Sequence, residues 1–353
     1  MAAPIDAARL AAFGADVLAA LGVPGGDARL VAESLVAADL QGHSSHGMLR
    51  LSWYAARLQS GAMAARTAPE TVSDLGAVCV VDGRDGVGQV VADHACRLAV
   101  ERAERHGIAA VAVRRSNHFG MAGYWTRRMA AAGCVGILTT NGSAAMAPWG
   151  GREKAIGANP WSIAVPGPEG PVVLDIANTL VARGKIYAAR ESGGTISADW
   201  ATDAAGRPTT DPDLALAGTL LPMAGHKGYG IAFMMDVLSG VLTGSAYGTG
   251  VNGPYVPDER SGCGHLAMAL RVDAVADPAE FEERLADLIA ATKAVPLAPG
   301  AAEILHPGEP EARREAECRR TGITVPAKTI AGLRDLAADC GLPFPLDHPE
   351  GHR

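Results

Sequence analysis

The feature that most restricts how this chain can fold is an alternation of short apolar runs with helical stretches, which begins at residue 77. The apolar runs cover residues 77–81, 108–113 and 135–139, and helical patterns cover residues 89–105 and 120–132. Apolar runs of strand length that alternate with helices in this way are typical of an α/β fold. We therefore expect a sheet whose strands are connected by helices in the middle of the chain.

The N-terminal segment carries two helical patterns, over residues 6–21 and 27–40. Each pattern starts at an aspartate, Asp6 or Asp27, whose carboxylate can cap the free backbone N–H groups of a first helical turn. The residues Val-Pro-Gly-Gly between them favour a tight turn, so we predict a helical hairpin. A third helical pattern starts at residue 48, and its spacing places Arg50, Tyr54 and Arg57 near one face.

The middle third of the chain is rich in glycine and proline. Patterns typical of strands and helices return toward the C-terminal end. The segment 188–213 reads as a long loop, and long loops are often functional. The further strands that we expect cover residues 161–165, 172–175 and 265–272, and the further helices cover residues 229–242, 278–293, 310–320 and 326–340.

Charge and composition narrow the possible functions. A net charge of -7 and a pI near 5.8 do not provide the basic surface that nucleic-acid binding requires. No stretch reaches the ~18 apolar residues of a membrane span, and the first residues lack the basic start of a signal peptide, so we expect a cytoplasmic protein without membrane or nucleic-acid partners. The six cysteines form no CxxC pair and no metal-binding spacing with histidine, so we expect reduced thiols and no bound metal.

A first candidate for chemistry is the polar turn at residues 42–50, Gly-His-Ser-Ser-His-Gly-Met-Leu-Arg. A histidine such as His46 can donate a proton to a developing alkoxide, and Arg50 can hold a carboxylate through two parallel hydrogen bonds. Reduction of a 2-oxo acid requires both. The turn alone fits equally well a capping segment with its histidines at the surface.

A second candidate is His118, in the sequence Ser-Asn-His-Phe-Gly that follows the expected strand 108–113. Open α/β sheets place ligands at the carboxyl ends of their parallel strands, so His118 can transfer a proton or orient a substrate. The structural alternative is a histidine that is satisfied by hydrogen bonds within a loop.

A third group consists of loops rich in glycine and asparagine, which let a ligand approach the backbone closely. It comprises Asn141-Gly142, Asn159-Pro160 and the strand residues Leu174-Asp175-Ile176, of which Asp175 can accept hydrogen bonds from ribose hydroxyls. Residue by residue, ordinary turn chemistry is the better explanation of these segments, and only their occurrence together in one chain points to a ligand.

A fourth candidate is the segment 225–230, Gly-His-Lys-Gly-Tyr-Gly, at the start of an expected helix. A helix N-terminus with a lysine favours an anion, so this segment can hold a diphosphate, although it is not a Walker A motif. The turn Gly308-Glu309 can add contacts or simply start a helix. Residues 83–88 do not match G-x-G-x-x-G, so composition and pattern identify no Rossmann dinucleotide site.

Together these segments resemble the type-2 malate/L-lactate dehydrogenase family over nearly the whole chain. That family includes ureidoglycolate dehydrogenase, diketogulonate reductase, sulfolactate dehydrogenase and the piperideine-2-carboxylate and pyrroline-2-carboxylate reductases. The resemblance is carried by Ser45-His46-Gly47 with Arg50 and Tyr54, by residues 116–120, by Gly-Ala-Asn-Pro at 157–160, by Val-Leu-Asp at 173–175, by residues 225–230 and by Pro-Gly-Glu at 307–309.

The resemblance implies an NAD(P)-binding fold that is not a Rossmann fold, which accounts for the missing glycine motif. It implies a helical domain built from both chain ends (1–75 and 300–353), a central α/β domain (76–120 and 225–299) and a cofactor-binding domain (121–224). It also implies a homodimer with active sites near the subunit contact.

The resemblance also implies roles for individual residues. His46 is expected to be the proton donor to the substrate oxygen, with Ser45 and His118 beside it, and Arg50 and Tyr54 are expected to bind the substrate. Members of the family differ over which histidine transfers the proton. The positions expected to contact the cofactor are Asn141, Gly142, Asn159, Pro160, Leu174, Asp175, Ile176, His226, Lys227, Gly228, Gly308 and Glu309.

The expected function is therefore an oxidoreductase that transfers hydride from NADH or NADPH to C2 of a small 2-oxo carboxylic acid, or that runs the reverse oxidation of a 2-hydroxy acid. One alternative is a reductase of cyclic imino acids, in which the same arginine holds the carboxylate. A second alternative is a homologue that binds the cofactor without catalysis. The sequence leaves the substrate, the choice between NAD and NADP, and the direction open.

Overall fold

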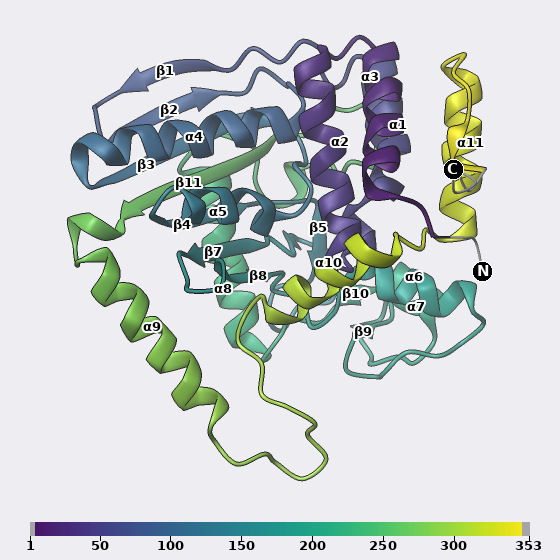
Figure 1. Ribbon diagram of the computed structural model, residues 1–353. Helices are drawn as coiled ribbons and strands as arrows, with labels where there is room; N and C mark the ends of the chain where they lie inside the picture. Colours follow the sequence, from purple (N-terminus) through teal and green to yellow (C-terminus); the bar gives the residue numbers. More distant parts are fainter. Residues whose placement is uncertain (1–3, 348–353) are drawn as a thin grey trace.

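The computed structural model describes residues 4–347, and its centre is a seven-stranded sheet (Figure 1). The strand order is β1-β2-β3-β11-β4-β7-β8. The strands are β1 (Glu70–Asp74), β2 (Val78–Asp82), β3 (Ile108–Ser116), β11 (Cys263–Arg271), β4 (Cys134–Thr140), β7 (Trp161–Val165) and β8 (Val172–Ile176). The apolar runs predicted in the middle of the chain all form strands of this sheet, which confirms the predicted α/β fold.

The strand directions differ from the expected parallel arrangement. Among the described strands of this sheet, β2 and β3 pair in parallel and every other pairing is antiparallel. Between β3 and β4 the cause is β11, which arrives from far along the chain and lies antiparallel to both (Figure 1). Local patterns correctly indicate a crossover from β3 to β4, but they do not show that a third strand separates the two. His118 nevertheless follows the carboxyl end of β3, which pairs in parallel with β2.

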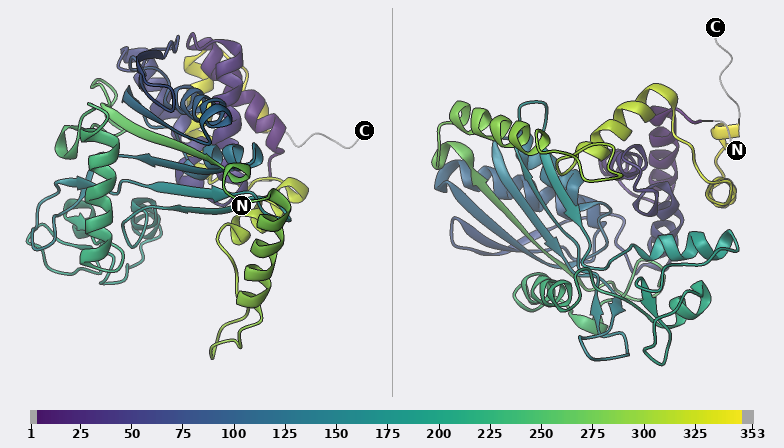
Figure 2. Two further views of the ribbon diagram at one scale, coloured as in Figure 1. Left: turned by 90° about the vertical axis from the view of Figure 1, so that its left-hand side faces the viewer. Right: turned by 90° about the horizontal axis from the view of Figure 1, so that it is seen from below.

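Helices cover both faces of the sheet. Helices α4 (Gly88–His106) and α5 (Ala122–Ala131) share an apolar core with β3, β4 and β11 that includes Leu138. Neighbouring strand residues point to opposite faces, and Thr139 bonds to Ser239 on the other side, with 2.8 Å between the hydroxyl oxygens. Ser239 lies in the π-helical turn Val237–Val241 that continues helix α8 (His226–Asp236), seen on the far side of the sheet in Figure 2.

The two chain ends build one helical unit beside the sheet. Helices α1 (Ala7–Ala20), α2 (Gly25–Leu40), α3 (Leu51–Ser60), α10 (Glu309–Thr321) and α11 (Ala327–Asp339) contribute to a common apolar core. Ile5 and Ile323 pair as an antiparallel bridge within it. This confirms a helical unit made from both ends. The domain boundaries themselves stay a prediction, and residues 1–3 and 348–353 of the predicted helical domain lie outside the described residues.

The starts of the first two helices differ in how they are capped. The Asp6 carboxylate accepts a hydrogen bond from the Arg9 backbone N–H at 3.0 Å, as predicted for α1. Helix α2 starts earlier than predicted, at Gly25, with Pro24 at the N-cap position and Asp27 inside the first turn. Proline has a restricted φ that suits a helix start, so the aspartate was the wrong signal here.

The middle third forms a smaller unit with its own sheet, ordered β6-β5-β10-β9. Its strands are β5 (Ala144–Met146), β6 (Ile156–Gly157), β9 (Ala201–Thr202) and β10 (Thr219–Leu220), with helices α6 (Arg183–Glu191) and α7 (Pro212–Ala217) beside them. The expected loop at 188–213 is therefore wrong at both ends. Ile186 is fully buried in the core of this unit, so tertiary burial supports a short helix that carries little sequence signal.

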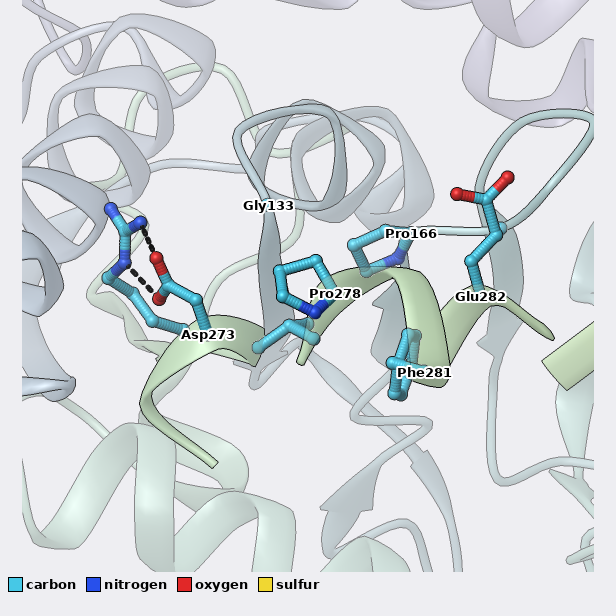
Figure 3. Close-up of a pocket in the computed structure, with 9 residues that line it drawn as sticks. Gly133, Pro166, Asp273, Pro278, Phe281 and Glu282 are labelled. Carbon is cyan, nitrogen blue, oxygen red and sulfur yellow. Dashed lines mark hydrogen bonds and ion pairs between the residues drawn. The ribbon is translucent and has the colours of Figure 1, made fainter. Parts of the chain in front are cut away.

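Helix α9 (Pro278–Lys293) has the bounds predicted from the sequence and projects away from the body (Figures 1 and 2). Asp277 caps it by accepting hydrogen bonds from the backbone N–H groups of Ala279 and Glu280. None of its residues is buried. A cavity of about 180 Å³ lies at its base, where Pro278 and Phe281 face Pro166 (Figure 3), and none of the predicted site residues lines it.

Two further observations concern the described part of the chain as a whole. None of its helices combines the length and the apolarity that a membrane span needs. The six cysteines are free thiols.

Candidate active site

The first predicted motif forms a 3-10 turn, Ser44–His46, between α2 and α3. The Ser45 hydroxyl lies 2.9 Å from His46 Nδ1, and Arg50 Nε donates a hydrogen bond to the Ser45 carbonyl at 2.5 Å. These contacts fix the imidazole and the guanidinium relative to the same turn, while His46 Nε2 stays available to a ligand.

Asp39, at the end of α2, holds this turn in place and was not among the predicted site residues. Its carboxylate accepts a hydrogen bond from the Met48 backbone N–H at 2.8 Å. A Cβ on Gly47 would lie 2.1 Å from Asp39 Oδ1, so only glycine fits between them. Burial raises the pKa of Asp39 to about 7, against the lowering effect of the Met48 hydrogen bond. An acidic residue just ahead of a histidine turn was the available sequence signal.

His118 lies in the loop after β3 and is bound through its Nδ1 atom. The Tyr54 hydroxyl is 2.7 Å from Nδ1, and the Gly120 backbone N–H donates to the same nitrogen at 3.2 Å. A backbone N–H can only donate, so Nδ1 accepts and the neutral ring carries its proton on Nε2. The buried Tyr54 thus contacts His118, whereas the resemblance implied a substrate-binding role for this tyrosine.

The two predicted histidines meet in space. The His46 and His118 rings stack with their centroids 5.5 Å apart and their planes 22° from parallel. His46 comes from the helical unit, and His118 comes from the loop that follows β3 of the central sheet. The structure therefore brings His46, Ser45, His118, Arg50 and Tyr54 into one cluster.

Both imidazoles are uncharged at neutral pH. Loss of hydration, with the neighbouring charges of Arg50 and His43, lowers the pKa of His46 to about 3. The same causes, burial first and Arg50 next, hold the pKa of His118 well below its ordinary value. A neutral imidazole can accept a proton, so the cluster in its resting state is equipped for general-base chemistry.

Arg50 provides the positive charge of the cluster. Its guanidinium carbon lies 4.1 Å from the centre of the Trp53 ring, and its Nε is used by Ser45. Within residues 4–347 no hydrogen bond engages its two terminal nitrogens. Those nitrogens form a planar fork that matches a carboxylate, so the arginine is free to bind an acid through two hydrogen bonds.

Arg57, which helical spacing placed on the same face, has a different role. It is buried, and its guanidinium donates to the carbonyl oxygens of Val256 and Glu259 and to Asn117 Oδ1. Asn117 in turn donates to the carbonyl of Gly86 at 2.9 Å. Arg57 therefore holds the loop that follows β3 rather than facing a ligand.

The predicted asparagines of the cofactor region are used by the scaffold. Asn141 donates to Asp236 Oδ1 and to a backbone carbonyl, and accepts from the Gly264 N–H at 2.9 Å. Asn159 accepts from the Gly142 N–H at 3.0 Å and donates to a carbonyl of α8 at 2.9 Å. Both side chains are buried, so these segments offer a ligand mainly their backbone.

Strand β8 carries Leu174, Asp175 and Ile176. The Asp175 carboxylate accepts a hydrogen bond from the Gly123 backbone N–H at 2.6 Å, at the start of α5. Burial raises the pKa of Asp175 to about 6, against the lowering effect of that bond. The carboxylate has one strong partner and keeps further acceptor sites for a ligand hydroxyl.

The other predicted cofactor segments flank this strand. The Val173 N–H donates to the Pro307 carbonyl at 3.2 Å, which places Gly308 beside β8. The Glu309 carboxylate is already paired with Lys293 at 2.7 Å and with Arg313. Pro160 lies just before β7, and its carbonyl accepts from the Thr140 N–H at 3.2 Å.

The start of α8 lies close to the end of β8. The Met223 N–H donates to the Asn178 carbonyl at 2.9 Å, so the chain leaving β8 runs beside the chain that enters α8. His226 and Lys227 are exposed, and Gly225 caps the helix without a side-chain hydrogen bond. A Cβ on Gly228 would lie 2.1 Å from the Met223 carbonyl oxygen, so this glycine serves the tight entry into the helix.

These features fit a dinucleotide. The first backbone N–H groups of α8 and the Lys227 ammonium suit a diphosphate, and Asp175 suits a ribose hydroxyl. Within the described residues, no group of three or more histidines, cysteines and acidic side chains is arranged to hold a metal ion.

The chain is similar to known proteins over nearly its whole length. The family model described as malate/L-lactate dehydrogenase matches residues 5–334. The chain is 38% identical to L-sulfolactate dehydrogenase of Methanocaldococcus jannaschii, covering 93% of this chain and 94% of that protein. It is 36% identical to (2R)-3-sulfolactate dehydrogenase (NADP(+)) of Chromohalobacter salexigens, over 75% and 78% of the two chains. It is 34% identical to ureidoglycolate dehydrogenase (NAD(+)) of Escherichia coli K12, over 84% and 85%.

Solved structures share the whole fold. The structure of sulfolactate dehydrogenase from Methanocaldococcus jannaschii superposes with a TM-score of 0.91 at 36% identity, covering 97% of this chain and 98% of that one. The structure of delta1-piperideine-2-carboxylate reductase from Pseudomonas syringae superposes with a TM-score of 0.83 at 25% identity, covering 95% and 99%.

Proposed function

The chain belongs to the malate/L-lactate dehydrogenase family, and from this membership we propose that it transfers hydride between NAD(P) and C2 of a small 2-hydroxy acid or its 2-oxo counterpart. The observation that carries the proposal is the stacked pair of neutral histidines, His46 and His118. Beside them lies Arg50, whose two terminal nitrogens form no hydrogen bond within residues 4–347. This cluster supplies a proton acceptor and a carboxylate holder at one place.

The proposed cofactor site lies between β8 and the start of α8. The nicotinamide cofactor, when bound, accepts or supplies the hydride. Asp175 holds a ribose hydroxyl, and the N-terminus of α8 with Lys227 holds the diphosphate. Related proteins include one named for NADP(+) and one named for NAD(+), so both cofactors belong in the first assay.

The hydrogen bonds support His46 as the residue that transfers the proton. His118 Nδ1 is occupied by two donors, so its remaining nitrogen carries a proton and cannot act as a base. His46 Nδ1 can donate to the Ser45 hydroxyl, which leaves Nε2 as a free acceptor. In oxidation His46 takes the hydroxyl proton of the substrate, and in reduction it returns a proton to the oxygen. Arg50 holds the carboxylate, and His118 donates a hydrogen bond.

The pH dependence of oxidation tests this assignment. His46 acts as a base only when it is unprotonated, which holds at every pH well above its folded pKa of about 3. We expect kcat/KM for hydroxy-acid oxidation to show no acid limb near 6.5, the ordinary histidine value. The profile is measured from pH 4.5 to 8 with circular dichroism at each pH to detect unfolding. A limb near 6.5 in folded protein would contradict the assignment.

A substrate panel tests the proposed function itself. Loss of NADH or NADPH absorbance is followed with 2-oxo acids and with cyclic imino acids. Turnover with a 2-oxo acid supports the proposal and identifies the cofactor. Turnover only with imino acids favours the alternative suggested by the similarity to the piperideine carboxylate reductase. Cofactor binding without any hydride transfer favours a non-catalytic homologue, which the cluster of His46, Arg50 and His118 argues against.

We also propose that the protein is a homodimer, in which α9 packs against a second copy. This 16-residue helix has no buried residue, yet Leu285, Leu288 and Ile289 lie at helical spacing along it, and Leu288 is 63% exposed. An apolar stripe on a projecting helix gains stability only when another surface covers it. A second copy of the chain is the partner that is always present.

Changing Leu288→Glu should shift the protein from dimer to monomer, because a charge in an apolar contact is poorly solvated. Sedimentation velocity measures the mass, which should be twice 36.1 kDa for the unchanged protein. Glu283→Lys, on the opposite face of the same helix, is the matched control and should leave the mass unchanged. An unchanged protein that sediments as a monomer would refute the dimer.

A further inference from the structure

Gln89, in the first turn of α4, is a buried amide without a hydrogen bond. Its side chain is fully buried, and neither its nitrogen nor its oxygen has a hydrogen-bond partner among the described residues. Buried amide groups are nearly always satisfied, because an unmet hydrogen bond away from water is costly. The groups that surround Gln89 should therefore show why a buried amide is present at this position.

Those surroundings are the cluster that holds His118. The preceding residue, Gly88, packs directly on the loop, because a Cβ there would lie 2.3 Å from the His118 carbonyl oxygen. A Cβ on Gly120 would lie 3.9 Å from Gln89 Nε2. Burial raises the pKa of Tyr54, and the Gln89 amide lowers it, because the amide lies close to the phenol although the two form no full hydrogen bond in this structure. Gln89 thus lies beside both groups that contact His118 Nδ1.

The donors and acceptors of this cluster have one consistent arrangement. The Gly120 N–H donates to His118 Nδ1, so that nitrogen is an acceptor. The Tyr54 hydroxyl, 2.7 Å from the same nitrogen, must then donate its only proton to it. The Tyr54 oxygen can then still accept a hydrogen bond from a second donor. The amide nitrogen of Gln89, Nε2, is such a donor.

We propose that Gln89 is a positioning residue, whose amide donates to the Tyr54 hydroxyl and thereby directs that hydroxyl to His118. The chain of donors runs from Gln89 through Tyr54 to His118 Nδ1, beside the Gly120 N–H that keeps the proton of His118 on Nε2. The inference rests on the proposed function, because it concerns the histidine that donates a hydrogen bond beside His46. It explains why a glutamine stays buried in the first turn of α4.

Two substitutions and their combination test the proposal. Gln89→Met keeps the length of the side chain and removes the amide, and Tyr54→Phe removes the hydroxyl. We expect Gln89→Met to lower kcat about tenfold, which corresponds to the loss of one hydrogen bond. In a Tyr54→Phe background the same change should cost less than about twofold, because residues that act through one contact are not additive. Losses that multiply in the double variant would overturn the proposal.

The control is Thr202→Val in the small sheet, which removes a buried hydroxyl contact to Thr219 at 3.0 Å and should leave kcat unchanged. If Gln89→Met folds poorly by thermal melting, Gln89→Leu is a second apolar replacement that removes the amide donor. It is expected to show the same loss and the same lack of additivity with Tyr54→Phe.

A readout that is independent of turnover separates this inference from the proposed function. Nitrogen-15 NMR of the histidine rings reports which nitrogen carries the proton, and a His118→Gln variant assigns the His118 signals. Unchanged protein should show His118 protonated on Nε2, and Gln89→Met should shift its Nδ1 signal, because the Tyr54 hydroxyl that donates to this nitrogen is no longer held in place. An unchanged His118 spectrum in Gln89→Met would overturn the inference, whether or not the substrate panel finds turnover.

Discussion

Replacing His46 with alanine is expected to lower kcat for hydroxy-acid oxidation by about 10²–10⁴-fold, the usual contribution of a general acid or base. The reason is geometric, because His46 Nε2 is the one nitrogen of the stacked pair that can accept a proton while both rings are neutral. Steady-state rates give kcat, thermal melting reports the fold, and cofactor fluorescence reports NAD(P) binding. The melting temperature and the binding of NAD(P) should change little.

The matched control for this change is His106→Ala, since His106 is an exposed histidine at the end of α4. It should leave kcat as it is. Imidazole added to the His46→Ala variant should restore part of the rate, because it can occupy the vacated space and accept the same proton. Turnover of His46→Ala within tenfold of the unchanged protein would show that another group transfers the proton.

Replacing Arg50 with methionine is expected to lower kcat/KM by about 10²-fold or more, because a hydrogen bond to a charged group is worth about 1.5–3 kcal/mol. The free terminal nitrogens of Arg50 lie on the same turn as His46, so they can hold the carboxylate while the proton moves. Arg50→Lys keeps the charge but loses the paired terminal nitrogens, so its kcat/KM should lie between those of Arg50→Met and the unchanged protein. Binding of an unreactive carboxylate inhibitor should weaken in parallel.

The same substitution has a second, electrostatic consequence. Burial lowers the pKa of His46 most and the charge of Arg50 lowers it next, so removal of that charge raises the pKa and moves the acid limb of oxidation to higher pH. Arg50→Lys should leave the limb nearly in place. If Arg50→Met loses no more activity toward pH 4.5 than the unchanged protein does, and substrate binding is also unchanged, Arg50 serves only to fix the Ser45 carbonyl.

Much of the architecture could be predicted from local patterns. Helix α9 and strand β7 have the bounds that periodicity and capping residues indicated. These elements carry their signal within a few consecutive residues, as an N-cap aspartate followed by proline or as an alternating apolar run. Helix α6 carries no such signal, and its burial against the small core came only with the folded chain.

The sequence by itself determined the family, the residue types of the site and most helices and strands, because those depend on motifs and periodicity that are local. Only the tertiary structure decided that β11 separates β3 from β4, that Arg57 and the asparagines serve the scaffold, and that Asp39 and Gln89 lie against the cluster. The tautomer of His118 also depends on contacts that join α3 to the loop after β3. Such pairings join segments distant along the chain, and no pattern within either segment specifies its partner.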